Sequence, residues 1–473
     1  MTPLLLLMAV AGGKVVAPAV PLTPCVLSHP AGARAYASCG EVAVAIDPAH
    51  PEKTIGIGFA VLPATGTAAR LDPIVFLAGG PGQAATRDYV GLLPSLASLH
   101  ANHDFVLVDI RGTGRSVPQS CKDVRPVAER IRAQNDVDEA AACAATMTLD
   151  PVFITTADAA RDVEAVRVAL RTEKWNVVGI SYGTRLAILY DQLFAGRART
   201  LTIDGVAPLD RALGDDISAD MSAALRAAGA PATGAGRQGD DVINALFALK
   251  AALKANPQMV KVPHPTTGKI LEVSVNAEVI NATVRMLLYA DETRSLVAML
   301  LKNALGSTDV APDLTPLVAL AISVAEQLEG SIHGPVSASI LCAEDAPYLS
   351  DEPQPVDAVF DDERPFIRAL CSKWPHARVA QPRMQPTQTP TLLLSGEFDP
   401  VTPPRHAQRI EGQFADHFHL IIPGLGHSIL ARGCVADIVA DFIGAGTAQH
   451  LDTSCAKKIG PAPVFVDSLG PAP

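Results

Sequence analysis

The chain has 473 residues, of which 48% are hydrophobic and 18% are charged. Such a chain can bury a large core, so general disorder is excluded, and we expect one large domain with an insertion. The formal net charge is -11, and the sequence contains no run of lysine and arginine residues. Because phosphate binding needs a basic surface, we expect no nucleic-acid partner. Small or cationic ligands are left open by the composition.

The N-terminal segment contains a short apolar run, from Leu4 to Val10. This run is too short to cross a bilayer, and the small residues from Ala9 to Ala11 resemble a signal-peptide cleavage site. A positively charged start is missing, so an unstructured apolar tail is the alternative interpretation. We favour export, periplasmic or secreted, and take residues 1–20 as a signal or flexible segment. No later segment has the pattern of an integral membrane span.

Short apolar, β-branched runs predict the strands. EVAVAID and TIGIGFAVLP, within residues 41–63, predict an opening antiparallel pair. Six later runs have the pattern of buried strands: PIVFLA, DFVLVD, WNVVGI, TLTIDGV, TLLLSG and HFHLIIP. Helical patterns lie between most of them. The sequence therefore predicts an α/β fold with a mostly parallel, doubly covered sheet.

The stretch GISYGT places Ser181 between two glycines, directly after the apolar run WNVVGI. A strand that turns sharply into a helix crowds its own backbone, and small residues on both sides of the serine relieve this crowding. The following TRLAILYDQLF is compatible with a helix. The pattern predicts a nucleophile elbow with Ser181 as the nucleophile; a chance occurrence in a glycine-containing chain is the alternative.

Strand-helix alternation stops between about Pro208 and Pro390. This interval contains the helical stretches DDVINALFALKAALKAN and DLTPLVALAISVAEQLEG and one hairpin pattern, VKVPHPTTGKILEVSV. We expect a mainly helical cap inserted over the sheet at residues 208–384. The core then comprises residues 21–207 and 385–460, and residues 461–473 form a flexible tail.

Two further polar residues follow later strands in the order that an α/β-hydrolase requires. Asp399 lies in GEFDPVTPP, after the strand TLLLSG, and His427 lies in GLGHS, after the next strand. The order serine, acid, histidine places all three at the carboxyl ends of successive strands. His427 would take the proton of Ser181, and Asp399 would fix the imidazole tautomer and stabilise its cation. Asp204 and Asp109 also end strands, and we rank both below Asp399.

An oxyanion hole completes the expected chemistry. One donor is expected to be the backbone N–H of Tyr182, directly after the nucleophile. The second is expected in the loop GGPG that follows the strand PIVFLA, with the N–H of Gly80 as the best choice. Glycine lets the backbone approach a developing oxyanion closely.

The eight cysteines fall into four locally spaced pairs with no C-x-x-C motif. The pairs are Cys25 with Cys39, Cys121 with Cys143, Cys342 with Cys371, and Cys434 with Cys455. The economical interpretation is four sequential disulfides in an oxidising compartment. Buried free thiols in a cytosolic protein are the alternative. A zinc ribbon or redox motif is disfavoured, and we expect neither a metal nor a cofactor.

The motifs AGGPG, DIRGTGRS, GISYGT, GEFDPVTPP and GLGHS, with the flanks CAED and CSKWP, extend over nearly the whole chain. Together they resemble the proline iminopeptidase and tripeptidyl aminopeptidase branch of the α/β-hydrolases, including exported members with a helical cap and a TAP-like C-terminal segment. The resemblance implies the triad Ser181, Asp399 and His427. It also places Arg111 and Arg115 in a loop that supports the site, which we interpret as salt bridges holding that loop. Where proline iminopeptidases commonly have histidine, this chain has Ala78.

The resemblance implies an aminopeptidase acting on peptide or small acyl substrates through an acyl-enzyme. Such an enzyme must bind the substrate ammonium, for which a carboxylate is the simplest partner. Glu344 and Asp345, in ILCAEDAPY, are the candidates, and a solvated acidic turn is the alternative. An esterase or other acyl hydrolase on the same triad is a second functional hypothesis. A third is a non-catalytic binding protein with a hydrolase-like fold.

Overall fold

The computed structural model describes residues 20–67, 71–121, 137–229, 238–328, 331–467 and 469–471. The N-terminal residues 1–19, on which the predicted export signal falls, lie outside this part of the chain. None of the described helices combines the length and apolar character needed to span a bilayer.

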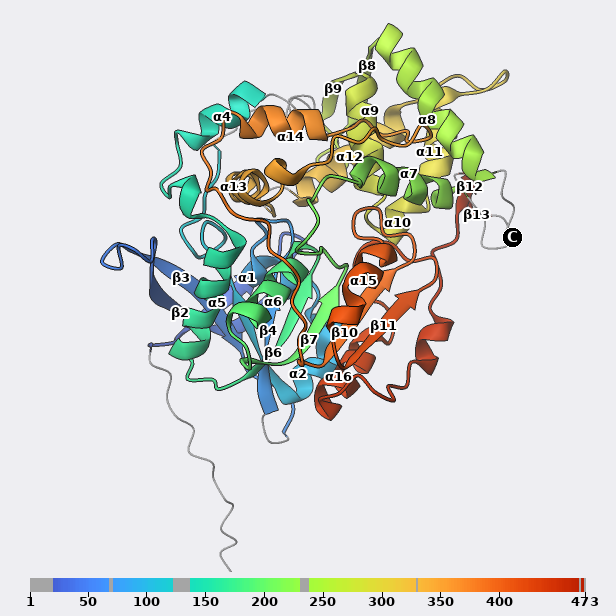
Figure 1. The fold of residues 1–473 in the computed structure, drawn as a ribbon. Coiled ribbons are helices and arrows are strands. Elements are labelled where there is room, and N and C mark those ends of the chain that lie inside the picture. Colours follow the sequence, from blue (N-terminus) through green and yellow to red (C-terminus); the bar gives the residue numbers. More distant parts are fainter. Residues whose placement is uncertain are drawn as a thin grey trace, which may run out of the picture.

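A nine-stranded sheet forms the centre of the molecule, in the order β1-β2-β3-β5-β4-β6-β7-β10-β11 (Figure 1). The first three strands pair antiparallel with their neighbours, and the rest of the sheet is parallel. Its strands are β1 (Thr23–Ser28), β2 (Arg34–Ala45), β3 (Thr54–Leu62), β4 (Leu71–Leu77), β5 (His103–Val108), β6 (Trp175–Ile180), β7 (Ala198–Asp204), β10 (Thr391–Gly396) and β11 (His417–Ile422). All eight predicted strands of the core are confirmed, and β1 is the one that the sequence pattern missed.

Helices cover both faces of this sheet, as the mostly apolar strands require. One apolar cluster joins a face of the sheet to α5 (Thr156–Ala169), α6 (Tyr182–Leu193) and α15 (Pro404–Ile410). A second cluster joins the other face to α1 (Ala85–Asp88), α2 (Ala97–Asn102) and α16 (Val435–Ala445). The predicted doubly covered α/β architecture is therefore confirmed.

Between β7 and β10 the chain forms a separate group of helices, drawn above the sheet in Figure 1. Many of them share an apolar cluster of their own, distinct from the two sheet clusters. The helices are α7 (Ile217–Ala228), α8 (Gln238–Ala255), α9 (Ala277–Leu287), α10 (Asp291–Arg294), α11 (Val297–Leu305), α12 (Thr315–Leu328), α13 (Gly334–Glu344) and α14 (Arg364–Cys371). The expected hairpin is present as β8 (Gln258–Pro263) and β9 (Ile270–Val275). We refer to this group as the cap.

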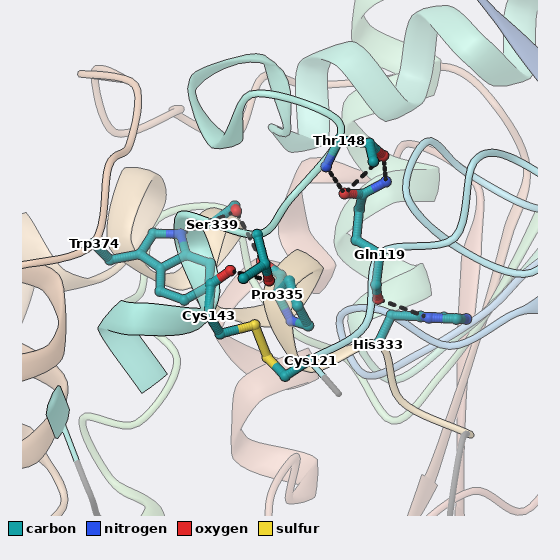
Figure 2. The surroundings of a disulfide bond; sticks show 9 residues. Gln119, Cys121, Cys143, Thr148, His333, Pro335, Ser339 and Trp374 are labelled. Atoms are coloured by element: carbon teal, nitrogen blue, oxygen red, sulfur yellow. Dashed lines mark hydrogen bonds between the residues drawn. A yellow bond between two sulfur atoms is a disulfide. The ribbon is translucent and has the colours of Figure 1, made fainter. Parts of the chain in front are cut away.

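All eight cysteines form disulfides, and the predicted neighbour pairing is confirmed in each case. Figure 2 shows the bond between Cys121 and Cys143 beside the cap residues Trp374 and His333. In the same region the indole N–H of Trp374 donates to the hydroxyl of Ser339 over 3.1 Å. The disulfide thus fastens a core loop next to the base of the cap.

Part of the C-terminal tail is regular, and the flexibility expected for residues 461–473 stays a prediction. Phe465–Asp467 form β12, which pairs with β13 (Gly470–Pro471). The N–H of Phe465 donates to the carbonyl of Ser295 in the cap over 3.0 Å. This contact gives the tail an anchor that composition alone does not reveal.

Candidate active site

Ser181 lies at a sharp turn between β6 and α6. Its backbone has φ 57° and ψ -125°, a strained combination for a residue with a side chain. A Cβ atom added to Gly179 would lie 2.3 Å from the carbonyl oxygen of Gly183, and one added to Gly183 would lie 2.2 Å from that of Leu77. Both glycines are therefore needed because main-chain atoms approach them. This confirms the predicted strand-turn-helix geometry around the serine.

We expect Gly183→Ala to lower kcat about 100-fold, because α6 must move away from β4 and carries Ser181 with it. The matched control is Gly444→Ala, since Gly444 lies in α16 with open space around its Cβ position. Steady-state kinetics and melting temperatures of the two variants give the comparison. Wild-type kcat in Gly183→Ala would contradict the assigned role of the glycine.

Asp399 and His427 lie in the loops after β10 and β11, where they form a hydrogen-bonded pair. The Nδ1 of His427 lies 2.8 Å from Oδ2 of Asp399. The other oxygen of Asp399 accepts the backbone N–H groups of Val401 and Thr402. The hydroxyl of Thr402 also donates to Oδ2 over 2.8 Å and lies 3.1 Å from Nδ1. The carboxylate is thus held in one orientation, against the Nδ1 side of the imidazole.

Burial and charge act in opposite directions on the pKa values of this pair. For His427, burial lowers the pKa, but the charge of Asp399, its hydrogen bond and the charge of Asp204 outweigh burial and raise it. For Asp399, burial raises the pKa, but the charge and hydrogen bond of His427 and the two N–H donors lower it. The lowered pKa favours the ionised form of Asp399, and the raised pKa favours the protonated form of His427.

The loop after β7 brings Ser181 and His427 to the same place. The N–H of Ser181 donates to the carbonyl of Asp204 over 2.8 Å. A Cβ atom on the next residue, Gly205, would lie 3.2 Å from Cε1 of His427 and 3.5 Å from Oδ2 of Asp399. Ser181, His427 and Asp399 are therefore grouped around residues 204 and 205.

We expect Asp399→Asn to reduce kcat by about 10⁴-fold, because the amide no longer fixes the working tautomer of His427. Asp204→Asn, at the competing acid, should lose far less. The measurements are kcat on one common substrate and the melting temperature of each variant. Equal losses, or the reverse order, would reassign the acid.

The loop Gly79–Gly82 lies directly against the nucleophile. A Cβ atom on Gly79 would come within 3.1 Å of Cβ of Ser181, and Gly80 has φ 106°, a conformation suited to glycine. Tyr182 is the first residue of α6, so its N–H has no carbonyl partner within the helix. The arrangement is compatible with Gly80 and Tyr182 as oxyanion donors, which stays a prediction.

The cap holds this loop from outside. The N–H of His333 donates to the carbonyl of Gly82 over 2.8 Å, and the hydroxyl of Ser337 donates to that of Pro81. The ring of His333 accepts the N–H of Gly114 at Nε2 and donates from Nδ1 to the carbonyl of Gln119, a contact visible in Figure 2. Burial lowers the pKa of His333, which keeps this ring neutral.

The cap also contacts the loop that carries His427, which the sequence did not suggest. The N–H of His427 donates to the carbonyl of Tyr289, and the Tyr289 ring lies edge-on to the imidazole, 5.6 Å between centroids. The N–H of Gly426 donates to Oδ1 of Asp291 over 2.7 Å, and Asp291 pairs with Arg294. No local motif marks these residues, because the contact joins segments far apart in the chain.

Glu344 and Asp345, the candidates for ammonium binding, lie buried between the cap and the core. Glu344 accepts the N–H and the hydroxyl of Thr156. Asp345 pairs with Arg185 of α6 over 2.8 Å and accepts the N–H of Leu213. Its Oδ2 atom is buried, and within the described chain it has no hydrogen-bond partner. The prediction that either acid binds an ammonium group stays a prediction.

Asp109 and Arg111 support the neighbouring loop through buried contacts. Asp109 accepts the N–H and hydroxyl of Thr86 and the N–H of Arg115. Arg111 binds Asp162 with two side-chain hydrogen bonds. The interpretation of Arg111 as a salt bridge that holds the loop is confirmed.

One group of side chains in the described part of the chain has the spacing of a metal site: Asp216, Asp220 and His406. Arg211 and Arg405 already pair with its two carboxylates. The positive charge that a cation would supply is therefore present in the protein itself, and ion pairing between the cap and α15 accounts for the cluster.

Family models match two parts of the chain. One, described as alpha/beta hydrolase fold, covers residues 72–263, and one described as TAP-like protein covers residues 357–455. Serine protease Hip1 of Mycobacterium tuberculosis is 26% identical over 92% of this chain and 90% of its own length. Tripeptidyl aminopeptidase of Streptomyces coelicolor is 33% identical over 36% of this chain and 35% of its own. Proline iminopeptidase of Neisseria gonorrhoeae is 29% identical over 28% of this chain and 32% of its own length.

Proposed function

Because this chain belongs to the α/β-hydrolases and has the TAP-like C-terminal segment, we propose that it is an exported serine aminopeptidase. It would release amino acids or short peptides from free N-termini through an acyl-enzyme on Ser181. The observation that carries this proposal is the buried pair of Asp399 and His427 beside the elbow that bears Ser181. The names of the relatives support a peptidase.

In the proposed mechanism, Oγ of Ser181 attacks the scissile carbonyl while Nε2 of His427 takes its proton. The N–H at Nδ1 of His427 stays hydrogen-bonded to ionised Asp399. Collapse of the tetrahedral intermediate breaks the C–N bond, and His427 returns the proton to the leaving amine. Water then hydrolyses the ester on Ser181 with the same histidine as base.

The oxyanion of both intermediates would be held by the N–H groups of Gly80 and Tyr182. The N-terminus of α6 adds a favourable partial positive charge at the same place. In this structure the glycine loop is hydrogen-bonded to the cap and Tyr182 is buried, which supports both as positioned donors.

The free substrate ammonium needs a counter-charge, which we assign to Glu344 or Asp345. Oδ1 of Asp345 pairs with Arg185, whereas Oδ2 has no hydrogen-bond partner among the described residues, which supports Oδ2 as the acceptor. Both acids are buried, so binding would require the cap to open at this point.

Export is proposed on the four disulfides, which persist in oxidising compartments. The segment before the described residues is the proposed signal.

We expect a peptide amide with a free N-terminus to react with a kcat/KM at least 30-fold above that of its N-acetylated form. Acetylation removes a charge-assisted contact that is worth about 2–5 kcal/mol when one partner of a buried pair is lost. The comparison is made on the wild type, Glu344→Gln and Asp345→Asn, with Ser181→Ala as the background control. The ratio of kcat/KM between the two amides should fall in the variant that lacks the acid responsible for binding the ammonium group.

Equal rates on the two amides in the wild type would contradict the aminopeptidase proposal. Faster turnover of short-chain esters in the same assay would favour an esterase instead. If the ratio of kcat/KM between the free and the acetylated amide keeps its wild-type value in both variants, the counter-charge lies elsewhere. Glu344 and Asp345 would then serve only as contacts between the cap and the core.

A further inference from the structure

Asp204 is a second buried carboxylate beside the histidine loop, and it has no role in the mechanism above. It ends β7, one residue before Gly205, and its side chain is fully buried. Its Oδ2 atom accepts the hydroxyl of Ser428 over 2.8 Å and the N–H groups of Ile429 and Leu430 over 2.9 and 2.8 Å. These three donors follow His427 directly in the chain.

The main chain of Asp204 contacts the nucleophile as well. Its carbonyl accepts the N–H of Ser181 over 2.8 Å. One residue therefore holds the backbone of the nucleophile through its carbonyl and the loop of the base through its carboxylate. Ser428 has φ 64°, so the loop bends sharply just after His427. The hydrogen bonds to Asp204 fix the chain at this bend.

The hydrogen bonds of Asp204 favour its ionised form. Burial raises the pKa of Asp204 above its ordinary value, and the donors at Ile429, Leu430 and Ser428 and the charge of His427 offset this rise only in part. In the described part of the chain, each hydrogen-bond partner of the Asp204 carboxylate is a donor. A protonated carboxyl group would need an acceptor as well, so these contacts suit the ionised form.

We propose that Asp204 is a positioning residue of the active site, which sets the orientation of His427 toward Ser181 and adds a second negative charge that stabilises the imidazolium. Asp399 remains the hydrogen-bonded acid of the triad in this assignment. The inference rests on the proposed serine hydrolase function, because it concerns the same base.

The charged and titratable groups around His427 come from three directions. Asp399 faces its Nδ1 from the loop after β10, and Asp204 approaches from β7. From the cap, Tyr289 lies against the ring, and Asp291 binds the preceding residue while paired with Arg294. Of these groups, Asp399 and Asp204 raise the pKa of His427 through their charges, and neither acid pairs with an arginine in the described part of the chain.

Two substitutions separate the charge of Asp204 from its geometry. In Asp204→Asn, an amide oxygen in the place of Oδ2 keeps three of the hydrogen bonds and removes the charge. We expect kcat within about tenfold of wild type and an acid limb of the kcat/KM profile that moves to lower pH. In Asp204→Ala the loop loses its acceptor, and we expect kcat to fall about 100-fold with KM little changed.

The matched control is Asp109→Asn. Asp109 is also a fully buried acid next to the end of a strand, and it also accepts three hydrogen bonds, but none of them comes from the histidine loop. The acid limb of the kcat/KM profile of Asp109→Asn should stay at the wild-type pH, even if the kcat of this variant changes. Melting temperatures of all variants show which of them are folded.

The inference is overturned if Asp204→Asn keeps the wild-type acid limb, or if its limb moves no more than that of Asp109→Asn. Wild-type kcat in a folded Asp204→Ala would equally overturn the positioning role. Ser181→Ala, assayed in parallel, distinguishes these outcomes from failure of the proposed function. If Ser181→Ala is inactive, only the role of Asp204 is rejected; if it is active, the triad itself is wrong.

Discussion

The site depends on the register of four parallel strands. Ile180 of β6 and Leu394 of β10 both pair with Asp204 of β7, and Gly396 of β10 pairs with Ile422 of β11. The four chains therefore leave the sheet at one edge, within reach of one another. Ser181, Gly205, Asp399 and His427 follow these strand ends. A slip of one residue in this pairing would turn each side chain to the other face and separate the catalytic groups.

The cap contacts several segments that lie at this edge of the sheet. It contacts the loop Gly79–Gly82 through His333, the loop after β11 through Tyr289, and α6 through Asp345. Each contact reaches a different part of the proposed machinery. Displacement of the cap would therefore change the positions of the donor loop and of the base together. The proposed active site therefore depends on both cap and core, although their apolar clusters are separate.

Much of this arrangement could be predicted from sequence because it rests on local signals. The glycines on both sides of Ser181 form a recognisable local pattern, and short apolar, β-branched runs indicate the strands. Tyr289 carries no such signal, since its contact with His427 joins positions 138 residues apart in the chain. Asp204 was visible as a strand-end acid, yet its donors become apparent only when the histidine loop is placed. The burial of Glu344 and Asp345 likewise depends on how the cap packs, which composition does not determine.

The proposed mechanism requires Ser181 to be an activated nucleophile. A phosphonofluoridate probe tests it directly, because a serine activated by a neighbouring base displaces fluoride and keeps the phosphonyl group. Intact-mass measurement and peptide mapping of the full chain should give one adduct, on Ser181, and none in Ser181→Ala. Labelling should slow strongly in Asp399→Asn. An unlabelled wild-type protein, or an adduct on another residue that persists in Ser181→Ala, would contradict the account.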